Sequence, residues 1–264
     1  MPQQIPPRQD VVRLRQRLES SEKSYGADHP EVAESLNNLA AVLCTLGRQV
    51  EAEPMMRRML AIAEKAYGPD DPDVATGLNN LAQLLQDTNR LAEAEPLMHR
   101  AAAIDEMSLG PDHPKRALRL SNLAGLLQAT NRSAEAEPLM RRALAIDEKA
   151  YDFEHPSVAR DLNNLALLLQ DTNRLAEAEP LMRRALAIDE KALGPEHPNF
   201  ARDLNNLAQL LKYTNRLAEA EPLMRRALEI FQNSLGPEHP DTITVRGNLA
   251  TLLRQMGKKD GDKL

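Results

Sequence analysis

Residues 157–198 read SVARDLNNLALLLQDTNRLAEAEPLMRRALAIDEKALGPEHP, and the next 42 residues match this segment at 32 positions. A proline recurs every 42 residues, at Pro30, Pro72, Pro114, Pro156, Pro198 and Pro240. A fixed period of this length is the signature of a repeat architecture. The sequence therefore divides into a half-repeat at 10–30, a capping helix at 241–257 and five whole repeats between them: 31–72, 73–114, 115–156, 157–198 and 199–240. We expect residues 1–9 to be disordered and residues 258–264 to form a flexible tail.

Each repeat contains two apolar patterns with helical spacing. In the repeat 157–198, Leu162, Leu165, Ala166 and Leu169 follow the i, i+3, i+4, i+7 spacing that marks one face of a helix. A second amphipathic pattern follows a short turn in the same repeat. The turn holds Gly or Asn throughout, which indicates a left-handed helix end: Gly47, Asn89, Asn131, Asn173, Asn215 and Gly257.

The joint between repeats has its own pattern. Gly-Pro ends most second helices, and His-Pro opens the next first helix with proline at its first position. One repeat has Asp152-Phe153 in place of Gly-Pro, and we expect Asp152 to adopt the left-handed conformation at modest cost. Asp71 replaces the histidine at one joint, which indicates that this position caps the helix.

A unit of two helices and about 40 residues is typical of tetratricopeptide, HEAT or armadillo repeats. The placement of small residues, such as Ala82 in a first helix and Ala94 and Ala101 in a second, favours the tetratricopeptide pattern. The string LNNLAxLL…EAEPLMRRALAIxEKALGPEHP closely resembles the 42-residue tetratricopeptide repeats of kinesin light chains and their bacterial relatives. This resemblance covers about residues 31–257. It implies an all-α fold, a right-handed α-solenoid of antiparallel helix pairs.

The resemblance has two departures. Kinesin light chains carry an N-terminal heptad coiled coil that joins the motor, and residues 1–30 contain no such heptads. The turn that this family writes as Gly-Lys-Tyr reads Thr-Asn-Arg here. The repeat type therefore carries over to this chain, but a motor partner does not.

Composition excludes several classes of function. The chain of 264 residues has a formal net charge of −6, four Tyr, three Phe and no Trp, which disfavours nucleic-acid binding. A single cysteine, Cys44, allows no internal disulfide. No signal peptide or membrane-spanning segment is visible, so we expect a cytoplasmic chain without membrane contact.

Histidines and glutamates recur, but their spacing argues against a metal site, a cofactor or an enzyme. Five histidines occupy the same joint of different repeats, too far apart to bind one ion: His29, His113, His155, His197 and His239. Paired glutamates such as Glu177 and Glu179 lie in the first turn of each second helix, where the helix dipole favours negative charge. We therefore predict helix capping for the histidines and a solvated helix face for the glutamates.

Asparagine recurs in the interior of the first helices, where it costs roughly half a kcal/mol relative to Ala. One row contains Asn38, Asn80, Asn122, Asn164, Asn206 and Asn248, and four of these follow another asparagine: Asn37, Asn79, Asn163 and Asn205. An amide both donates and accepts hydrogen bonds, as a peptide backbone does. The resemblance implies that these residues hold an extended peptide in the concave groove. The alternative is that they bond to the adjacent helix and only rigidify the stack.

Groove positions that vary between repeats are expected to set specificity, and we assign Gln128, Gln170, Arg160, Arg202, Lys212 and Arg254 to binding. The last four are basic and predict a partner protein with an acidic segment. Two other classes of function compete with this peptide-binding scaffold. Similar repeats can stack end to end into a self-assembling solenoid, although Arg246 replaces a core leucine and suggests a cap. A helical repeat that reads RNA is opposed by the acidic balance.

Overall fold

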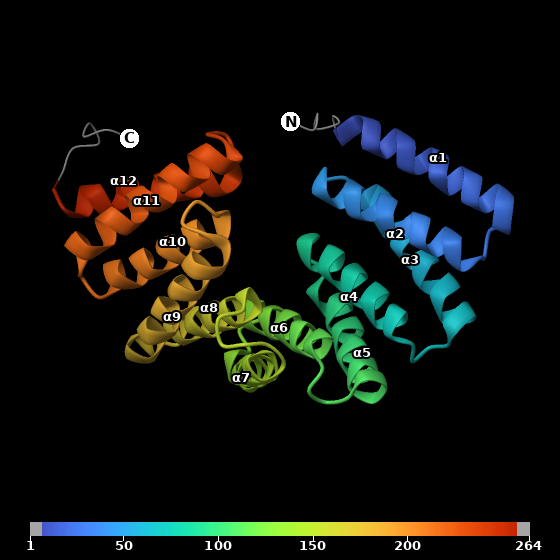
Figure 1. Cartoon of the computed structure of the whole chain (residues 1–264), viewed down its shortest axis with the longest axis horizontal. Coiled ribbons are helices and arrows are strands. Elements are labelled where there is room, and N and C mark those ends of the chain that lie inside the picture. Colours follow the sequence, from blue (N-terminus) through green and yellow to red (C-terminus); the bar gives the residue numbers. More distant parts are fainter. Residues whose placement is uncertain (1–6, 258–264) are drawn as a thin grey trace. The chain divides into compact units, whose positions relative to one another are not determined.

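The computed structural model describes residues 7–257, and all regular elements within this range are α-helices. The helices divide into two compact units, one ending at Thr130 and one beginning at Asn131. Each unit has antiparallel helix pairs in which a first helix packs against the second helix of its own repeat (Figure 1). The chain is an all-α repeat solenoid.

The described part of unit 1, residues 7–130, contains six helices, coloured blue to green in Figure 1. The half-repeat supplies α1, and first and second helices alternate after it. Their bounds are α1 Pro7–Tyr25, α2 Pro30–Thr45, α3 Gln49–Tyr67, α4 Pro72–Asp87, α5 Leu91–Leu109 and α6 Pro114–Ala129. Residues 7–9 belong to α1, so this helix begins earlier than the sequence pattern predicted. Residues 1–6 and 258–264, the rest of the two expected terminal segments, lie outside the described residues.

Unit 2 also contains six helices and begins with a second helix. The bounds are α7 Ser133–Ala150, α8 Pro156–Asp171, α9 Leu175–Leu193, α10 Pro198–Tyr213, α11 Leu217–Leu235 and α12 Pro240–Gln255. Each first helix begins at the recurring proline, as the 42-residue period predicted.

The residues at the helix ends act as the sequence indicated. The turn asparagines have φ between 59° and 61°, and Gly47 and Gly257 have φ near 70°. A histidine N-caps five of the first helices, and in each its Nδ1 accepts a hydrogen bond from the backbone N–H two residues later. Asp71 does the same through its carboxylate, at 2.8 Å from the N of Asp73. The capping role predicted for this position is therefore confirmed.

The joint after α7 differs from the expectation. Asp152 is not among the residues with positive φ, and α7 ends one residue early, with Tyr151 extended at φ −116° and ψ 174°. The Tyr151 ring stacks on His155 at 3.9 Å, while the Asp152 carboxylate accepts from the Glu154 N–H. The chain thus turns without a left-handed residue, because Asp152 stands where the other joints have glycine and its carboxylate caps the joint.

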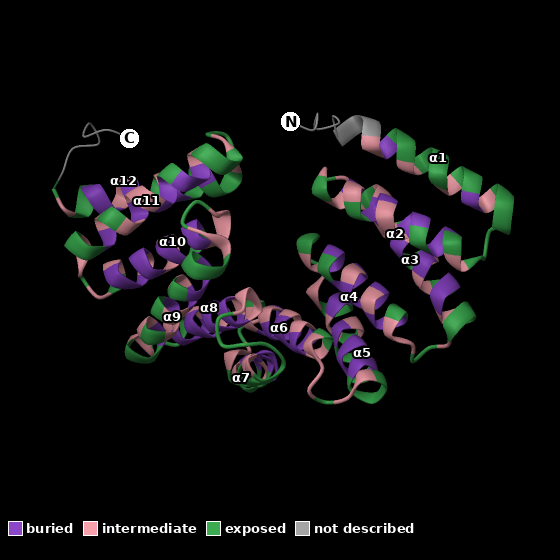
Figure 2. Ribbon diagram, viewed as in Figure 1, coloured by how far each residue is buried: buried purple, intermediate pink, exposed green. Residues whose placement is uncertain are grey.

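Leucines and alanines form the interior of both units. In unit 2, Val158, Ala159, Leu162, Ala185 and Ile188 form one buried cluster between α8 and α9. Buried residues follow the helix sides that face neighbouring helices, and exposed residues follow the opposite sides (Figure 2). Alanine at the closest crossings lets two helices approach, which is why the small residues recur at fixed positions of the repeat.

Candidate functional site

The asparagines of successive first helices bond to one another. In unit 1, Asn80 donates from Nδ2 to Oδ1 of Asn37 at 3.3 Å, and Asn122 donates to Asn79 at 2.8 Å. In unit 2, the same bonds join Asn206 to Asn163 at 3.3 Å and Asn248 to Asn205 at 3.1 Å. Each bond links the second asparagine of one repeat to the first asparagine of the preceding one.

Two of the four residues of the first asparagine row are buried, while Asn37 and Asn205 are partly buried. Asn79 and Asn163 are 4 % and 6 % exposed, and Asn163 also donates to Oδ1 of the Asp203 carboxyl at 2.8 Å. These two residues were assigned to ligand contact, and the structure instead buries them between helices. Residues of the second row are only partly buried, as Asn122 and Asn206 show.

The second row, Asn38, Asn80, Asn122, Asn164, Asn206 and Asn248, can bond to a ligand as well as to the stack. An amide group has two N–H donors and an oxygen with two acceptor sites. The bond between repeats uses one of those donors in Asn80, Asn122, Asn206 and Asn248. The two roles considered for these asparagines are therefore compatible, since the bond to the stack fixes the amide in one orientation.

The variable positions are less uniformly basic than their sequence suggests. Arg160 donates to Asp161 and Asp147, each at 3.0 Å, so two carboxyls oppose its charge. Arg202 is exposed and donates to the Asn199 side chain at 3.0 Å. Lys212, Gln128 and Gln170 are partly buried, and Arg254 is exposed. The acidic carboxyls beside Arg160 come from the repeat joints, a feature that the sequence reasoning missed.

One pair of positions faces across each repeat joint, fourteen residues apart in the sequence, and we call it the joint pair. In unit 1 the pair is Ser21/Ser35, Ala63/Gly77 and Asp105/Arg119. In unit 2 it is Asp147/Asp161, Asp189/Asp203 and Phe231/Val245. All of these residues are buried. Lining up the six joints would have revealed this variation, because buried charges at a core position are unusual.

In the charged joint pairs, burial and the neighbouring charge shift the pKa values of the side chains. Asp105 and Arg119 approach to 3.3 Å, and Arg119 also donates to Thr76 at 3.0 Å. Burial and the neighbouring Asp161 carboxyl raise the pKa of Asp147 to about 6, against the opposing effect of Arg160. Burial and Asp189 raise the pKa of Asp203 to about 7, and burial also raises the pKa of Asp189. The two carboxyls of each pair lie buried together, which favours the protonated forms of Asp147 and Asp203.

A pocket of about 290 Å³ opens at the joint of α2, α3 and α4 in unit 1. The small joint pair Ala63/Gly77 lies in its lining together with Met59. Asn37 and Thr76 also line it, so the pocket adjoins the asparagine rows. Three carboxylates complete the polar part of the lining, and they are Glu31, Glu34 and Asp73.

Comparison with known proteins identifies the repeat. Two tetratricopeptide repeat models match the chain, one at residues 73–149, 157–233 and 204–260 and the other at residues 32–73. The chain belongs to the tetratricopeptide repeat family. Repeats of this family generally mediate protein–protein interaction, and the scaffold is generally not enzymatic. No curated protein matches the chain.

Solved structures place the tetratricopeptide repeats of this chain among those of kinesin light chain type. BtubC (BKLC) from P. vanneervenii is 21% identical, with a TM-score of 0.73 and coverage of 89% of this chain and 94% of that one. A kinesin-light-chain-like protein with nearly identical repeats from Podospora anserina is 28% identical, with a TM-score of 0.64 and coverage of 78% and 98%. The pilF protein of Pseudomonas aeruginosa is 19% identical, with a TM-score of 0.58 and 91% coverage of both chains. For BtubC and pilF the likeness shows the fold alone.

Arginine–glutamate pairs hold successive tetratricopeptide repeats together at the helix starts. The turn residue Arg174 donates from Nε and Nη2 to Glu177 and from Nη1 to Glu137 of the preceding repeat. Arg90 makes the same three bonds to Glu93 and Glu53 in unit 1. This geometry gives a structural reason for Thr-Asn-Arg at the turn, since Arg can bond to two carboxylates at once.

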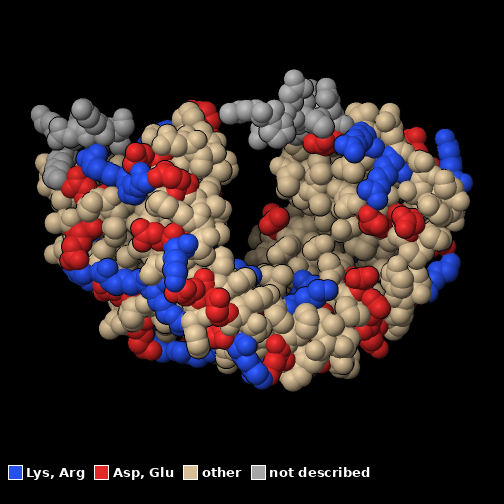
Figure 3. Space-filling model, in the orientation of Figure 1, with Lys and Arg blue, Asp and Glu red and all other residues tan. Residues whose placement is uncertain are grey.

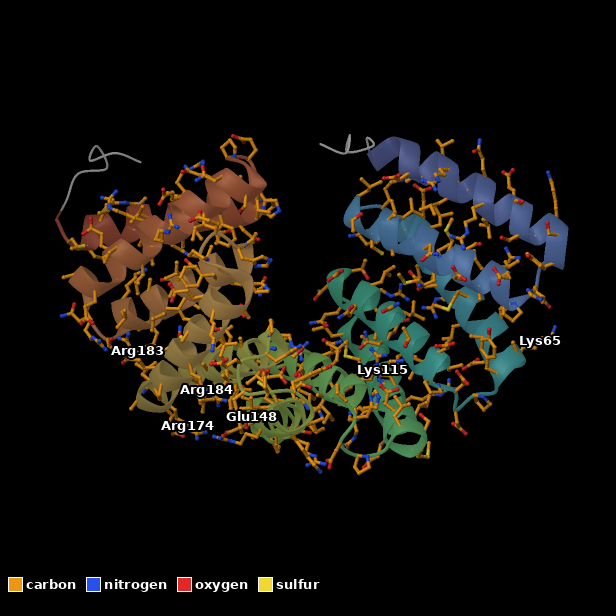
Figure 4. All side chains as sticks on the ribbon, viewed as in Figure 1. Lys65, Lys115, Glu148, Arg174, Arg183 and Arg184 are labelled. Carbon is orange, nitrogen blue, oxygen red and sulfur yellow. The ribbon has the colours of Figure 1, made fainter. Side chains whose placement is uncertain are left out.

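A second set of ion pairs links the middle of one second helix to the last turn of the preceding second helix. Arg184 on α9 lies 2.6 Å from Glu148 on α7, and Figure 4 shows the two side chains next to each other. Arg58 and Glu22 repeat this pair in unit 1 at 2.6 Å. Acidic and basic side chains interleave over the visible face of each unit (Figure 3). The glutamates therefore belong to a solvated and ion-paired surface.

Among the described residues, no helix is both long and apolar enough to cross a membrane.

Proposed function

We propose that this chain is a scaffold that binds an extended segment of a partner protein on its first helices. The observation that carries the proposal is the second asparagine row, partly buried at one position per repeat and oriented by bonds between repeats. Each unit contributes three members of the row. Unit 1 has Asn38, Asn80 and Asn122, and unit 2 has Asn164, Asn206 and Asn248.

The spacing of the row suits a peptide. Neighbouring helix layers are about 10 Å apart, and an extended chain advances about 3.3 Å per residue, so every third residue meets an amide. An amide oriented by the stack loses less conformational entropy when a ligand binds, which favours affinity. In this proposal the ligand bonds through its backbone, and side chains at the variable positions decide which sequence is bound.

The partner segment that meets unit 2 is proposed to be acidic. Arg202, Lys212 and Arg254 are basic groups at variable positions of this unit. Arg160 contributes less, because Asp147 and Asp161 accept its hydrogen bonds. Charge complementarity of this kind raises association rates and excludes like-charged partners more than it raises affinity.

The test begins with peptides selected against the full chain from a displayed random library. Binding is then measured by fluorescence anisotropy with Asn122→Ala and Asn206→Ala. Each change removes the hydrogen-bonding groups of one residue of the second asparagine row. We expect each variant to lose about 1 kcal/mol of binding free energy, or roughly fivefold in Kd. Asn233→Ala is the matched control, because Asn233 is an exposed helical asparagine on α11, outside the first helices. If all three variants bind the peptide equally, the asparagine row does not contribute to binding.

End-to-end self-association is the competing function and is decided by a different measurement. Val12 on α1 and Ile243 on α12 are exposed on the first and last described helices. Light scattering over a concentration series would show the molar mass growing with concentration if the ends associate. A constant mass of about 29 kDa (29.4 kDa from the sequence) would exclude assembly over that range.

A further inference from the structure

We propose that the pocket between α2, α3 and α4 is a binding site for a basic side chain, a lysine or arginine of the partner segment. Its aliphatic stem lies against Met59 and Ala63. Its cationic end lies among Glu31, Glu34 and Asp73. The inference rests on the proposed function for the source of this side chain, and it adds a site that differs in charge from the basic positions of unit 2.

The pocket lies at the joint whose pair is the smallest of the six, and Met59 forms part of its lining. Gly77 stands where the other joints have Ser35, Arg119, Asp161, Asp203 or Val245. A Cβ added to Gly77 would lie 3.0 Å from Cε of Met59 and 3.3 Å from its sulfur. Gly77 therefore lets Met59 occupy the space that a side chain would fill at another joint. A volume of about 290 Å³ is small for a drug-sized ligand and large enough for one long side chain.

The polar part of the lining is acidic. Glu31, Glu34 and Asp73 line the pocket, and no lysine or arginine does. Arg17 of α1 donates to Glu34 at 2.8 Å, and both side chains remain about half exposed. One of the three carboxylates is thus partly neutralised at the surface, and the lining stays negative.

The acidity of the lining is not required by the helix starts. Glu31 and Asp73 lie in first turns, where the helix dipole stabilises a carboxylate. At the same position α8 and α10 have Ser157 and Asn199, while α12 has Asp241, so the fold tolerates neutral residues there. At the position of Glu34, unit 2 has Arg160 and Arg202. The same surface is therefore acidic at the start of unit 1 and carries two arginines on α8 and α10 of unit 2.

A basic side chain fits this combination better than an apolar or acidic one. Lys and Arg bury their methylene stems along apolar surface and keep the charge in water, which matches an apolar floor below an acidic rim. An aliphatic side chain would leave the carboxylates without a partner, and an acidic side chain would be repelled. Tyr67, half exposed in the lining, adds an aromatic ring that a cation can approach.

The experiment uses the full chain with its methionine methyl groups labelled for NMR. The probes are the N-acetyl methylamides of lysine, norleucine and glutamate, titrated to millimolar concentration at low salt. We expect the lysine probe to shift the Met59 methyl signal saturably and to bind about fivefold more tightly than norleucine, which has the same stem without the charge. The signal of Met182, buried in unit 2, is the internal control.

Two variants locate the binding. Gly77→Leu fills the pocket and should abolish the lysine titration, whereas Gly125→Leu places the same residue on α6 where an added Cβ meets nothing within 4 Å. The double change Glu31→Gln/Asp73→Asn, at two exposed positions, should weaken the lysine probe to the level of norleucine. If Gly77→Leu fails to fold by circular dichroism, the charge variant decides alone.

Three results would overturn the inference. They are equal binding of the lysine and norleucine probes, no saturable shift of the Met59 signal, and lysine binding that survives the charge variant. These outcomes are separate from the fate of the peptide scaffold, because the small probes require only the pocket. Selected peptides that lose affinity on Asn122→Ala but ignore the charge variant would support the scaffold and reject the basic side chain.

Discussion

Units 1 and 2 share one repeat and differ at the joint pair. Unit 1 places two hydroxyls, two small residues and one ion pair at its three joints. Unit 2 places two carboxyl pairs and one apolar pair at the corresponding joints. All lie in the same buried place between a second helix and the next first helix. The comparison teaches that the alanines and leucines around the joint define the fold, while the joint pair is left to vary in charge and size.

The largest effect is expected from breaking the buried ion pair of unit 1. Arg119→Leu leaves the fully buried Asp105 carboxylate without its cation, and we expect unit 1 to lose about 3–5 kcal/mol at neutral pH. Hydrogen exchange of the amides in α4 and α6 measures the loss unit by unit. The control is Asp105→Ala/Arg119→Leu, which removes both charges and should regain most of the stability. If Arg119→Leu lowers the free energy of unfolding by less than about 1 kcal/mol, Arg119 does not stabilise the buried charge of Asp105.

The second prediction concerns pH and separates the two units. Asp147 and Asp203 have folded-state pKa values of about 6 and about 7, above the ordinary unfolded value near 3.9. The protonated form therefore stabilises the fold, and that contribution is complete below the unfolded pKa and is lost as pH rises through 6 and 7. We expect each pair in unit 2 to lose roughly 2 kcal/mol between pH 5 and pH 8.

Unit 1 serves as the internal reference for this measurement. Hydrogen exchange is measured and corrected for the intrinsic effect of pH on the exchange rate. As pH rises, the protection of amides in α8 and α10 should fall, and the protection of amides in α2 and α4 should change less. Asp147→Asn/Asp203→Asn removes the carboxyl with the most raised pKa from each pair and should remove most of the pH dependence. If both units lose protection equally over this pH range, the carboxyl pairs are not the cause of the pH dependence.

The third prediction compares two buried asparagines at the same repeat position. Asn79→Ala in unit 1 removes the acceptor of the Asn122 bond and should cost about 1 kcal/mol. Asn163→Ala in unit 2 removes the acceptor of Asn206 and also the donor to Asp203, so it should cost about 2 kcal/mol. Urea unfolding with both variants measures the difference, and Asn233→Ala should be neutral. A larger cost in unit 1 would reverse the expected order.

The smallest effect is expected at the exposed turn arginines, and it should be equal in the two units. Arg90→Ala and Arg216→Ala each remove a side chain that bonds to two glutamates at the surface. Exposed ion pairs contribute little and are screened by salt. We expect small and similar decreases in Tm that shrink further in about 0.5 M salt. A decrease that persists in high salt would indicate a packing role for the arginine stem.

Prediction from sequence succeeded best where the cause is local. The prolines at the helix starts, the histidine caps and the left-handed turn asparagines all depend on residues within one turn of the chain. The exception at Asp152 also has a local cause, because Asp152 replaces the glycine of the other joints and Tyr151 ends the helix in an extended conformation. The expectation of a left-handed Asp152 was wrong, because its carboxylate instead accepts a hydrogen bond from the Glu154 N–H.

For the candidate site, prediction from sequence located the asparagine rows but not their burial. Asn163 and Asn164 are neighbours on α8, yet Asn163 is buried against Asp203 and Asn164 is only partly buried. Helix rotation relative to the next repeat decides which of two adjacent amides turns inward. The packing of helices also explains why Arg160 offers less positive charge to a ligand than its residue type predicted. Asp147, on another helix, accepts a hydrogen bond from it.

The sequence by itself determined the repeat length, the helix starts, the turns and the all-α class, because a 42-residue period and helix caps act within a single unit. Tertiary structure alone decided which polar residues meet across a joint, where Asp189 and Asp203 lie buried together and where a pocket opens beside Gly77. The physical reason is that burial and electrostatic coupling depend on the distance between helices. Two residues fourteen positions apart have no fixed distance until both helices are packed.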